Sequence, residues 1–241
     1  MTSIVDISSS FAKTQAQNNV CLRDNVESVF TMIKIHSTKK LLIKLPVNEQ
    51  GILPPDKNAP PHQGNNTEHA ESVLSGWHAN LITLQRRNCI LFVHDVTRFP
   101  LFIPCLTNPD FAALDWYFQD AFMNTLLKIG ADDSMMNRAG ALLQPLCFDT
   151  DCNRSVQGTI NQMAGDIEYS IDFRDVNIQD VSPYRMSAWL ADRPCTIKGQ
   201  KDCVWPIKAM GELLGGSIAP MQSIKRKQHA ESSGGTDIIE L

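Results

Sequence analysis

One short stretch, residues 76–95, places histidine, asparagine, arginine and aspartate side chains among apolar residues (GWHANLITLQRRNCILFVHD). Its apolar alternation predicts two strands joined by the four residues QRRN. That connection pairs residue 80 with residue 93 and sets His78 opposite Asp95, so we expect a hydrogen bond between their side chains. A carboxylate that orients a histidine is typical of a general base, although a solvated strand end gives the same pair more often. His94, on the opposite face, completes the set of catalytic candidates.

A second set of candidates follows from the predicted helix over 151–171. Arg154, Gly158, Asn161 and Gly165 are spaced i, i+4, i+7 and i+11, which places them on one stripe. Glycine within a helix costs about 1 kcal/mol relative to alanine, so either another helix packs closely there or a ligand approaches the backbone.

The first turn of that helix is a candidate anion site. The helix dipole disfavours a cation such as Arg154 at this end unless an anion accompanies it, and Ser155 adds a hydroxyl to the free N–H groups. The candidate ligand-binding residues are therefore Arg154, Ser155, Gly158 and Asn161.

Metal and cofactor signals are weak in the sequence. Cys147 and Cys152 enclose four residues, and Cys195 and Cys203 enclose seven, which is wider than structural zinc sites usually show. The G-x-S-x-G, H-E-x-x-H and glycine-rich phosphate-loop motifs are all missing. From the sequence we expect neither a metal ion nor a cofactor, and seven cysteines that remain reduced in a cytosol.

The sequence argues against two classes of partner. A net charge of −4 and a pI near 5.8 make non-specific binding of nucleic acid unlikely. The longest apolar runs are far too short to span a membrane, and the N-terminus is a poor signal peptide. We expect a cytoplasmic protein whose partner is a small anionic ligand or another protein.

The order of elements predicts an α+β fold. The hairpin 77–95 and flanking strands, including an edge strand at 99–106, form a small antiparallel sheet. Helices predicted at 108–130, 151–171, 182–192 and 205–215 pack against this sheet.

Three segments are predicted along the chain. Residues 1–31 are polar and form a disordered or non-native extension, whereas 32–219 form a single α+β domain. Within that domain 46–72 is a long loop rich in proline, asparagine and glycine. Residues 220–241 carry no core pattern and are expected to be a disordered tail.

Three stretches resemble a widespread bacterial domain family of unknown function. These stretches are IKIHSTKKLLIKL, WHANLITLQRRNCILFVHDVTRFPLFIP and NRSVQGTINQMAGDIEY, in that order along the chain. The resemblance covers about residues 32–215, with His36 where the family often has cysteine. It supports a domain over these residues and brings no established activity with it.

Two hypotheses about function remain, and the sequence favours the first of them because no nucleophile or metal motif is found. The first is a non-catalytic binding or accessory protein that recognises an anion or a partner near Arg154 and Asn161. The second is a small hydrolase or nucleic-acid-processing enzyme, with His78, His94 or Asp95 as base and Arg154 holding a phosphate. A concave pocket that joins His78, Asp95, Arg154 and Asn161 would favour the enzyme.

Overall fold

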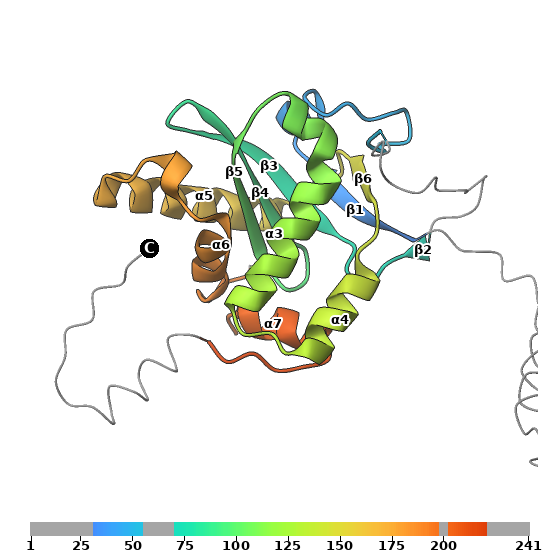
Figure 1. Cartoon of the computed structure of the whole chain (residues 1–241), viewed down its shortest axis with the longest axis vertical. Helices are drawn as coiled ribbons and strands as arrows, with labels where there is room; N and C mark the ends of the chain where they lie inside the picture. The colour runs from blue at the N-terminus through green and yellow to red at the C-terminus, as the bar shows by residue number, and fades with distance from the viewer. Residues whose placement is uncertain (1–30, 55–69, 198–201, 221–241) are drawn as a thin grey trace, which may run out of the picture.

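A mixed β-sheet covered by helices on both faces forms the centre of the molecule (Figure 1). The computed structural model describes residues 31–54, 70–197 and 202–220. Its main strands, in the order β6-β1-β3-β4-β5, are Leu146–Asp149, Thr31–Ser37, Trp77–Leu84, Arg87–His94 and Pro100–Leu106. The two-residue strand β2, Ala70–Glu71, pairs with the start of β1. Strand β1 runs parallel to β3 and β6, whereas β3, β4 and β5 are antiparallel. The α+β class is confirmed, with a sheet that is mixed rather than purely antiparallel.

The hairpin between β3 and β4 turns more tightly than predicted. Leu84 pairs directly with Arg87, so only Gln85 and Arg86 form the connection, at φ angles of 44° and 64°. Two successive left-handed residues match the twist of the flanking strands, which favours this short turn over a four-residue one. The predicted register was therefore wrong by two residues. A shift of two keeps every side chain on its predicted face, because side chains alternate with a period of two.

Helices surround the sheet and connect its strands. They are α2 (Lys39–Leu42), α3 (Leu114–Lys128), α4 (Asp133–Leu142), α5 (Arg154–Arg174), α6 (Pro183–Ala191) and α7 (Pro206–Leu213), with 3-10 turns at Pro109–Ala113 and Ile178–Asp180. All four helices predicted after the hairpin are present near their expected positions. Strand β6 and helix α4 were not predicted.

Both faces of the sheet are buried. Helix α3 crosses one face (Figure 1). There Trp77 and Phe118 meet edge to face, with ring centroids 5.1 Å apart. Helix α5 covers the other face and buries one apolar stripe against it: Val156, Ile160, Met163, Ile167 and Ile171. The face of the hairpin that carries His78 therefore lies under α5.

The outer edge of the sheet is protected by α6. Strand β5 ends the strand order, as predicted for a strand that contains Pro100 and Pro104. The backbone N–H of Phe102 donates to Oγ of Ser187 in α6 at 2.9 Å, which satisfies a donor that an edge strand otherwise leaves open.

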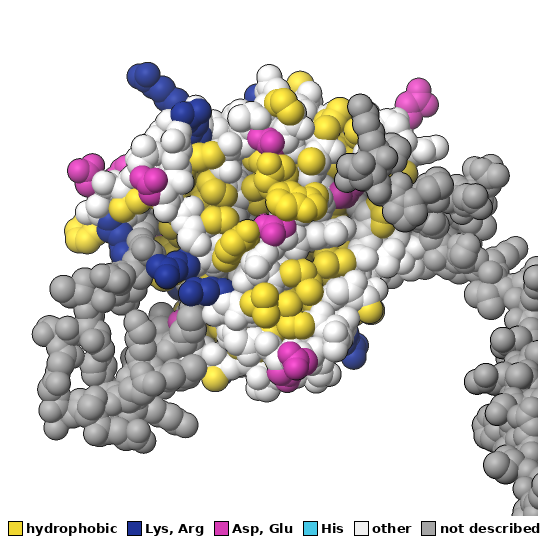
Figure 2. Space-filling view, viewed as in Figure 1, with side chains coloured by type: hydrophobic (Ala, Val, Ile, Leu, Met, Phe, Trp, Pro, Cys, Tyr) yellow, Lys and Arg dark blue, Asp and Glu magenta, His cyan; other side chains and the backbone are white. Residues whose placement is uncertain are grey.

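On the outside of the molecule, hydrophobic side chains lie among polar atoms over the face that carries α3 (Figure 2). Trp116 and Leu127 of α3 are 59% and 58% exposed. Within the described residues, every helix is too short or too polar to cross a membrane. Three predicted segments lie wholly or partly outside the described residues: the extension 1–31, the loop 46–72 and the tail 220–241.

Candidate functional site

Three neighbouring strands bring polar side chains into one row. In the parallel pairing of β1 with its neighbours, His36 lies beside Asp149 of β6 and beside His78 of β3. Paired residues on adjacent strands point to the same face, here the face covered by α5. The row lies at the carboxyl ends of β1 and β6, and such ends are where open α/β sheets commonly bind ligands.

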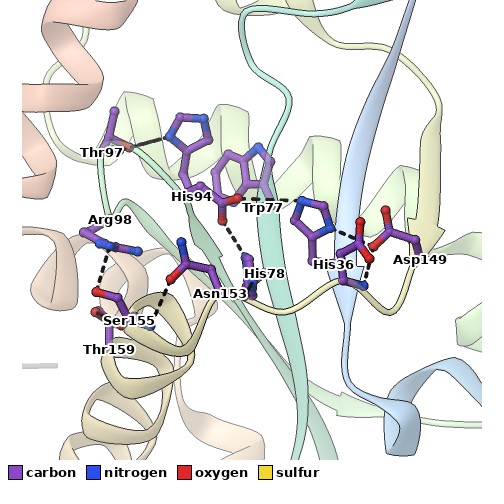
Figure 3. Close-up of polar contacts among 12 residues, drawn as sticks. His36, Trp77, His78, His94, Thr97, Arg98, Asp149, Asn153, Ser155 and Thr159 are labelled. Atoms are coloured by element: carbon purple, nitrogen blue, oxygen red, sulfur yellow. Dashed lines mark hydrogen bonds and ion pairs between the residues drawn. The ribbon is translucent and has the colours of Figure 1, made fainter. Parts of the chain in front are cut away.

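His78 is held by two hydrogen bonds at the centre of the site. Its Nδ1 lies 2.6 Å from Oδ1 of Asp95, and its Nε2 lies 2.7 Å from the backbone nitrogen of Asn153 (Figure 3). A backbone N–H can only donate, so Nε2 accepts and the ring proton is on Nδ1, donated to Asp95. The predicted contact between His78 and Asp95 is confirmed. With both nitrogens engaged and 1% exposure, His78 orients Asp95 and the start of α5.

His36 presents a ring nitrogen to the pocket. Its Nδ1 lies 2.7 Å from Oδ1 of Asp149, which accepts the proton and fixes the ring orientation. Its Nε2 lies 3.8 Å from Oδ2 of Asp95, too far for a hydrogen bond. His36 and Asp95 therefore direct one nitrogen and one oxygen toward the same point.

These groups line an open pocket of about 520 Å³ at the first turn of α5. Its lining residues are His36, His78, Asp95, Asp151, Cys152, Asn153 and Arg154. The side chain of Asn153 caps α5 by accepting the backbone N–H of Ser155 at 2.9 Å. The pocket thus combines two histidine–carboxylate pairs with the positive end of a 21-residue helix and one arginine.

A second arginine, Arg98, lies behind that first turn. Its Nη2 donates to Oγ of Ser155 at 3.2 Å, whereas Nε and Nη1 are buried and lack a hydrogen-bond partner among the described residues. The residue is 4% exposed and has a left-handed backbone, with φ of 58°. Burial lowers the pKa of its guanidinium, and the nearby Asp95 opposes that shift. The start of α5 therefore has a buried cation beneath it.

His94 lies on the other face of the sheet, away from this pocket. Its ring meets Trp77 edge to face at 5.0 Å, and its Nδ1 accepts the backbone N–H of Thr97 at 3.2 Å. Burial lowers its pKa to about 4, so the ring is neutral at pH 7. The structure places His94 in the aromatic core.

The glycine stripe of α5 faces solvent. Gly158, Asn161 and Gly165 are exposed, and a Cβ added at either glycine would have nothing within 4 Å in the described structure. Close packing by another described helix therefore does not account for the glycines. Of the four residues predicted to bind a ligand, Arg154 lines the pocket and Ser155 contacts Arg98; Gly158 and Asn161 lie farther along the helix.

The sequence did not identify two residues that line the pocket, His36 and Asp151. It also did not identify two residues that contact the lining or the first turn of α5, Asp149 and the buried Arg98. The alternation of Ile33 and Ile35 with Lys34 and His36 was a usable signal for His36, because it assigns His36 to the face opposite the apolar one. Asp149 belongs to a strand that was not predicted, so its place beside His36 required the fold.

The sequence matches a known protein family but no curated protein. The sequence model of the family described as Domain of unknown function (DUF6933) matches residues 34–209. A search of the curated proteins found no significant match. The chain therefore belongs to the DUF6933 family, in agreement with the predicted membership of a domain family of unknown function.

Proposed function

We propose that this member of the DUF6933 family is a hydrolase that cleaves a small phosphate ester in the pocket at the start of α5. One observation carries the proposal: Nε2 of His36 and Oδ2 of Asp95 face each other 3.8 Å apart in a pocket lined by Arg154. His78, Asp95 and Arg154 share this pocket, which favours the enzyme hypothesis over non-catalytic binding even though Asn161 lies outside it.

The positive end of α5 supports recognition of a phosphate. The free N–H groups and the dipole at a helix N-terminus attract anions, and Arg154 adds a full charge at the rim. The Arg98 guanidinium strengthens the positive potential from below, 3.2 Å from Oγ of Ser155 in the same turn. A phosphate at this end of the pocket would lie next to His36 and Asp95.

His36 and Asp95 supply the chemistry. A water molecule between them can be polarised by two acceptors, since Nδ1 of His36 is already bound to Asp149. The water oxygen attacks phosphorus and forms a new P–O bond, while the bond to the ester oxygen breaks. The proton of the water passes to an acceptor in the pocket, and the leaving oxygen takes a proton from solvent, which yields an alcohol and inorganic phosphate.

A direct test is hydrolysis of p-nitrophenyl phosphate and bis-p-nitrophenyl phosphate by the full chain. We expect His36→Ala to lower kcat by about 100-fold or more, as loss of a group that activates water does. Arg154→Ala is expected to raise KM about tenfold, because Arg154 binds the substrate rather than the water.

Matched controls use the same helix. Arg174→Ala and Asp172→Asn change exposed charges at the far end of α5 and should leave both constants unchanged. Saturable phosphate binding without turnover of either ester would instead leave the non-catalytic binding protein as the function. Wild-type rates in His36→Ala would contradict the assignment of the pocket.

A further inference from the structure

We propose that the site holds a divalent transition-metal ion between Nε2 of His36 and Oδ2 of Asp95, with Asp151 as a further ligand. The role of the ion rests on the proposed hydrolase function, since it would activate the attacking water. Its binding is a separate property and can be measured without a substrate.

The spacing of the two facing atoms suits a shared ion. In the neutral ring with its proton on Nδ1, Nε2 of His36 has a lone pair, and Oδ2 of Asp95 is a carboxylate oxygen, so neither donates to the other. Their separation is 3.8 Å. Two ligand atoms about 2.1 Å from a tetrahedral ion lie roughly 3.4 Å apart, so a small side-chain rotation is enough to bring both onto one ion.

A hydrogen bond to the atom that faces away from the ion fixes the orientation of each of the two ligands His36 and Asp95. Asp149 holds the far nitrogen of His36 at 2.7 Å, the carboxylate–histidine arrangement that recurs behind metal-binding histidines. His78 holds Oδ1 of Asp95 at 2.6 Å and is itself fixed by the backbone N–H of Asn153, which leaves Oδ2 directed at His36. His78 is 1% exposed, and this buried residue fixes the Asp95 carboxylate so that Oδ2 points into the pocket.

The third ligand and the local charge agree with a cation. One atom each of His36, Asp149 and Asp151 lie within 4.8 Å of one another, a cluster that does not include Asp95. Asp151 is exposed at the pocket, so its side chain must rotate to reach an ion held between His36 and Asp95. Three carboxylates, those of Asp95, Asp149 and Asp151, meet at a site whose lining carries the single arginine Arg154. A divalent ion would relieve their mutual repulsion.

The donor set selects a class of metal. Imidazole nitrogen with carboxylate oxygen suits Zn²⁺, Mn²⁺ or Fe²⁺, whereas Ca²⁺ takes oxygen ligands alone. An ion held by two or three protein ligands keeps open positions for water and for a phosphate oxygen. The phosphate would then be held between the ion and the start of α5.

The test is titration of the full chain with Mn²⁺, followed by the loss of the free-ion electron paramagnetic resonance signal. Mn²⁺ is preferred as the probe because cysteine sulfur, such as that of Cys152, binds it less well than it binds Zn²⁺. We expect one saturable site in the wild type. Asp95→Asn should weaken binding more than tenfold, since its amide oxygen can still accept from His78 but its NH₂ group cannot bind a metal.

Two further variants guard against misfolding and non-specific binding. His36→Ala should also lose the site, with its melting temperature measured alongside, and Asp172→Asn should bind Mn²⁺ like the wild type. The proposal is overturned if the folded wild type shows no saturable site, or if both pocket variants bind like the wild type. Mn²⁺ binding without ester hydrolysis would reject only the proposed function, and ester hydrolysis that persists in EDTA, without Mn²⁺ binding, would reject only the metal.

Discussion

Three histidines of this domain differ in chemistry because of the atoms around each ring. His78 uses both nitrogens in hydrogen bonds, and His94 is buried beside Trp77. His36 alone among these three directs a nitrogen into the pocket. At the residue scale, hydrogen-bond partners and burial therefore decide which of these histidines can take part in chemistry.

The buried His94 should make stability depend on pH. Its pKa is about 4 in the folded state against 6.5 as the ordinary value, so between these two pH values the unfolded state binds more protons. Stability is fully present above pH 6.5 and falls as the pH drops toward 4, with a loss of about 2 kcal/mol from this group at pH 5.

Urea unfolding at pH 7.5 and pH 5 measures this loss. In His94→Gln, whose amide cannot take up the proton, the decrease between the two pH values should be smaller by about 2 kcal/mol. An equal decrease in the variant and the wild type would show that His94 does not titrate as described.

Arg98 offers a test that separates a stabilising role from a functional one. A buried guanidinium with a single hydrogen bond contributes little stability, so Arg98→Met should not lower the melting temperature. The variant should nevertheless show a smaller rise in melting temperature on addition of inorganic phosphate, because the positive potential under α5 is reduced. A large loss of stability with an unchanged phosphate effect would make Arg98 structural.

At the scale of elements, α5 connects the core to the pocket. One side of the helix packs on the sheet, its first turn borders the pocket, and its glycine stripe faces solvent. Different residues of α5 therefore stabilise the fold and border the pocket, so the two sets of residues can be substituted separately.

We predict that Gly158→Ala and Gly165→Ala each stabilise the protein by about 1 kcal/mol. Both glycines have space for a Cβ and neither has a positive φ, so alanine restrains the unfolded chain without a clash. Chemical denaturation checks the gain. If Gly158→Ala stabilises the fold and also abolishes phosphate binding, the ligand contacts the helix backbone at Gly158, and the pocket assigned here is incomplete.

Elements with a strong local pattern could be predicted from the sequence, whereas the pairing between distant segments could not. The apolar period of α5 and the alternation of β3 and β4 each lie within a single stretch. Strand β6 has only four residues, and its parallel pairing joins Asp149 to His36 across 113 positions of chain. The hairpin register was missed because Gln85 and Arg86 form a turn usually made by asparagine and glycine.

The same distinction explains what was found of the site. His78 and Asp95 are close in sequence, so their contact could be expected, and Arg154 was identified from the helix dipole. His36 and Arg98 reach the site only through β-sheet pairing and the packing of α5, which no local pattern encodes.

At the scale of the whole molecule, two apolar clusters on opposite faces of one sheet form the core. Ile33 near the start of β1 and Ile218 after α7 belong to the same apolar cluster. Residues from both ends of the described region therefore pack into one cluster.

We predict that a chain trimmed to residues 32–219 unfolds cooperatively with nearly the wild-type free energy. A chain that ends at residue 213 loses the buried Leu214 and Ile218 and should be less stable by about 3 kcal/mol or more. Denaturant unfolding of the two chains checks both expectations. Failure of residues 32–219 to fold would mean that the domain needs segments outside this range.

The central claim is that the pocket between His36, Asp95 and the start of α5 binds a phosphate group. Its most direct measurement is a titration of ¹⁵N-labelled protein with inorganic phosphate, followed by the backbone amides and the histidine ring signals. We predict saturable shifts at Asn153, Arg154 and the His36 ring, with His94 and Arg174 unchanged. Saturable shifts confined to other parts of the molecule, or none at all, would contradict it.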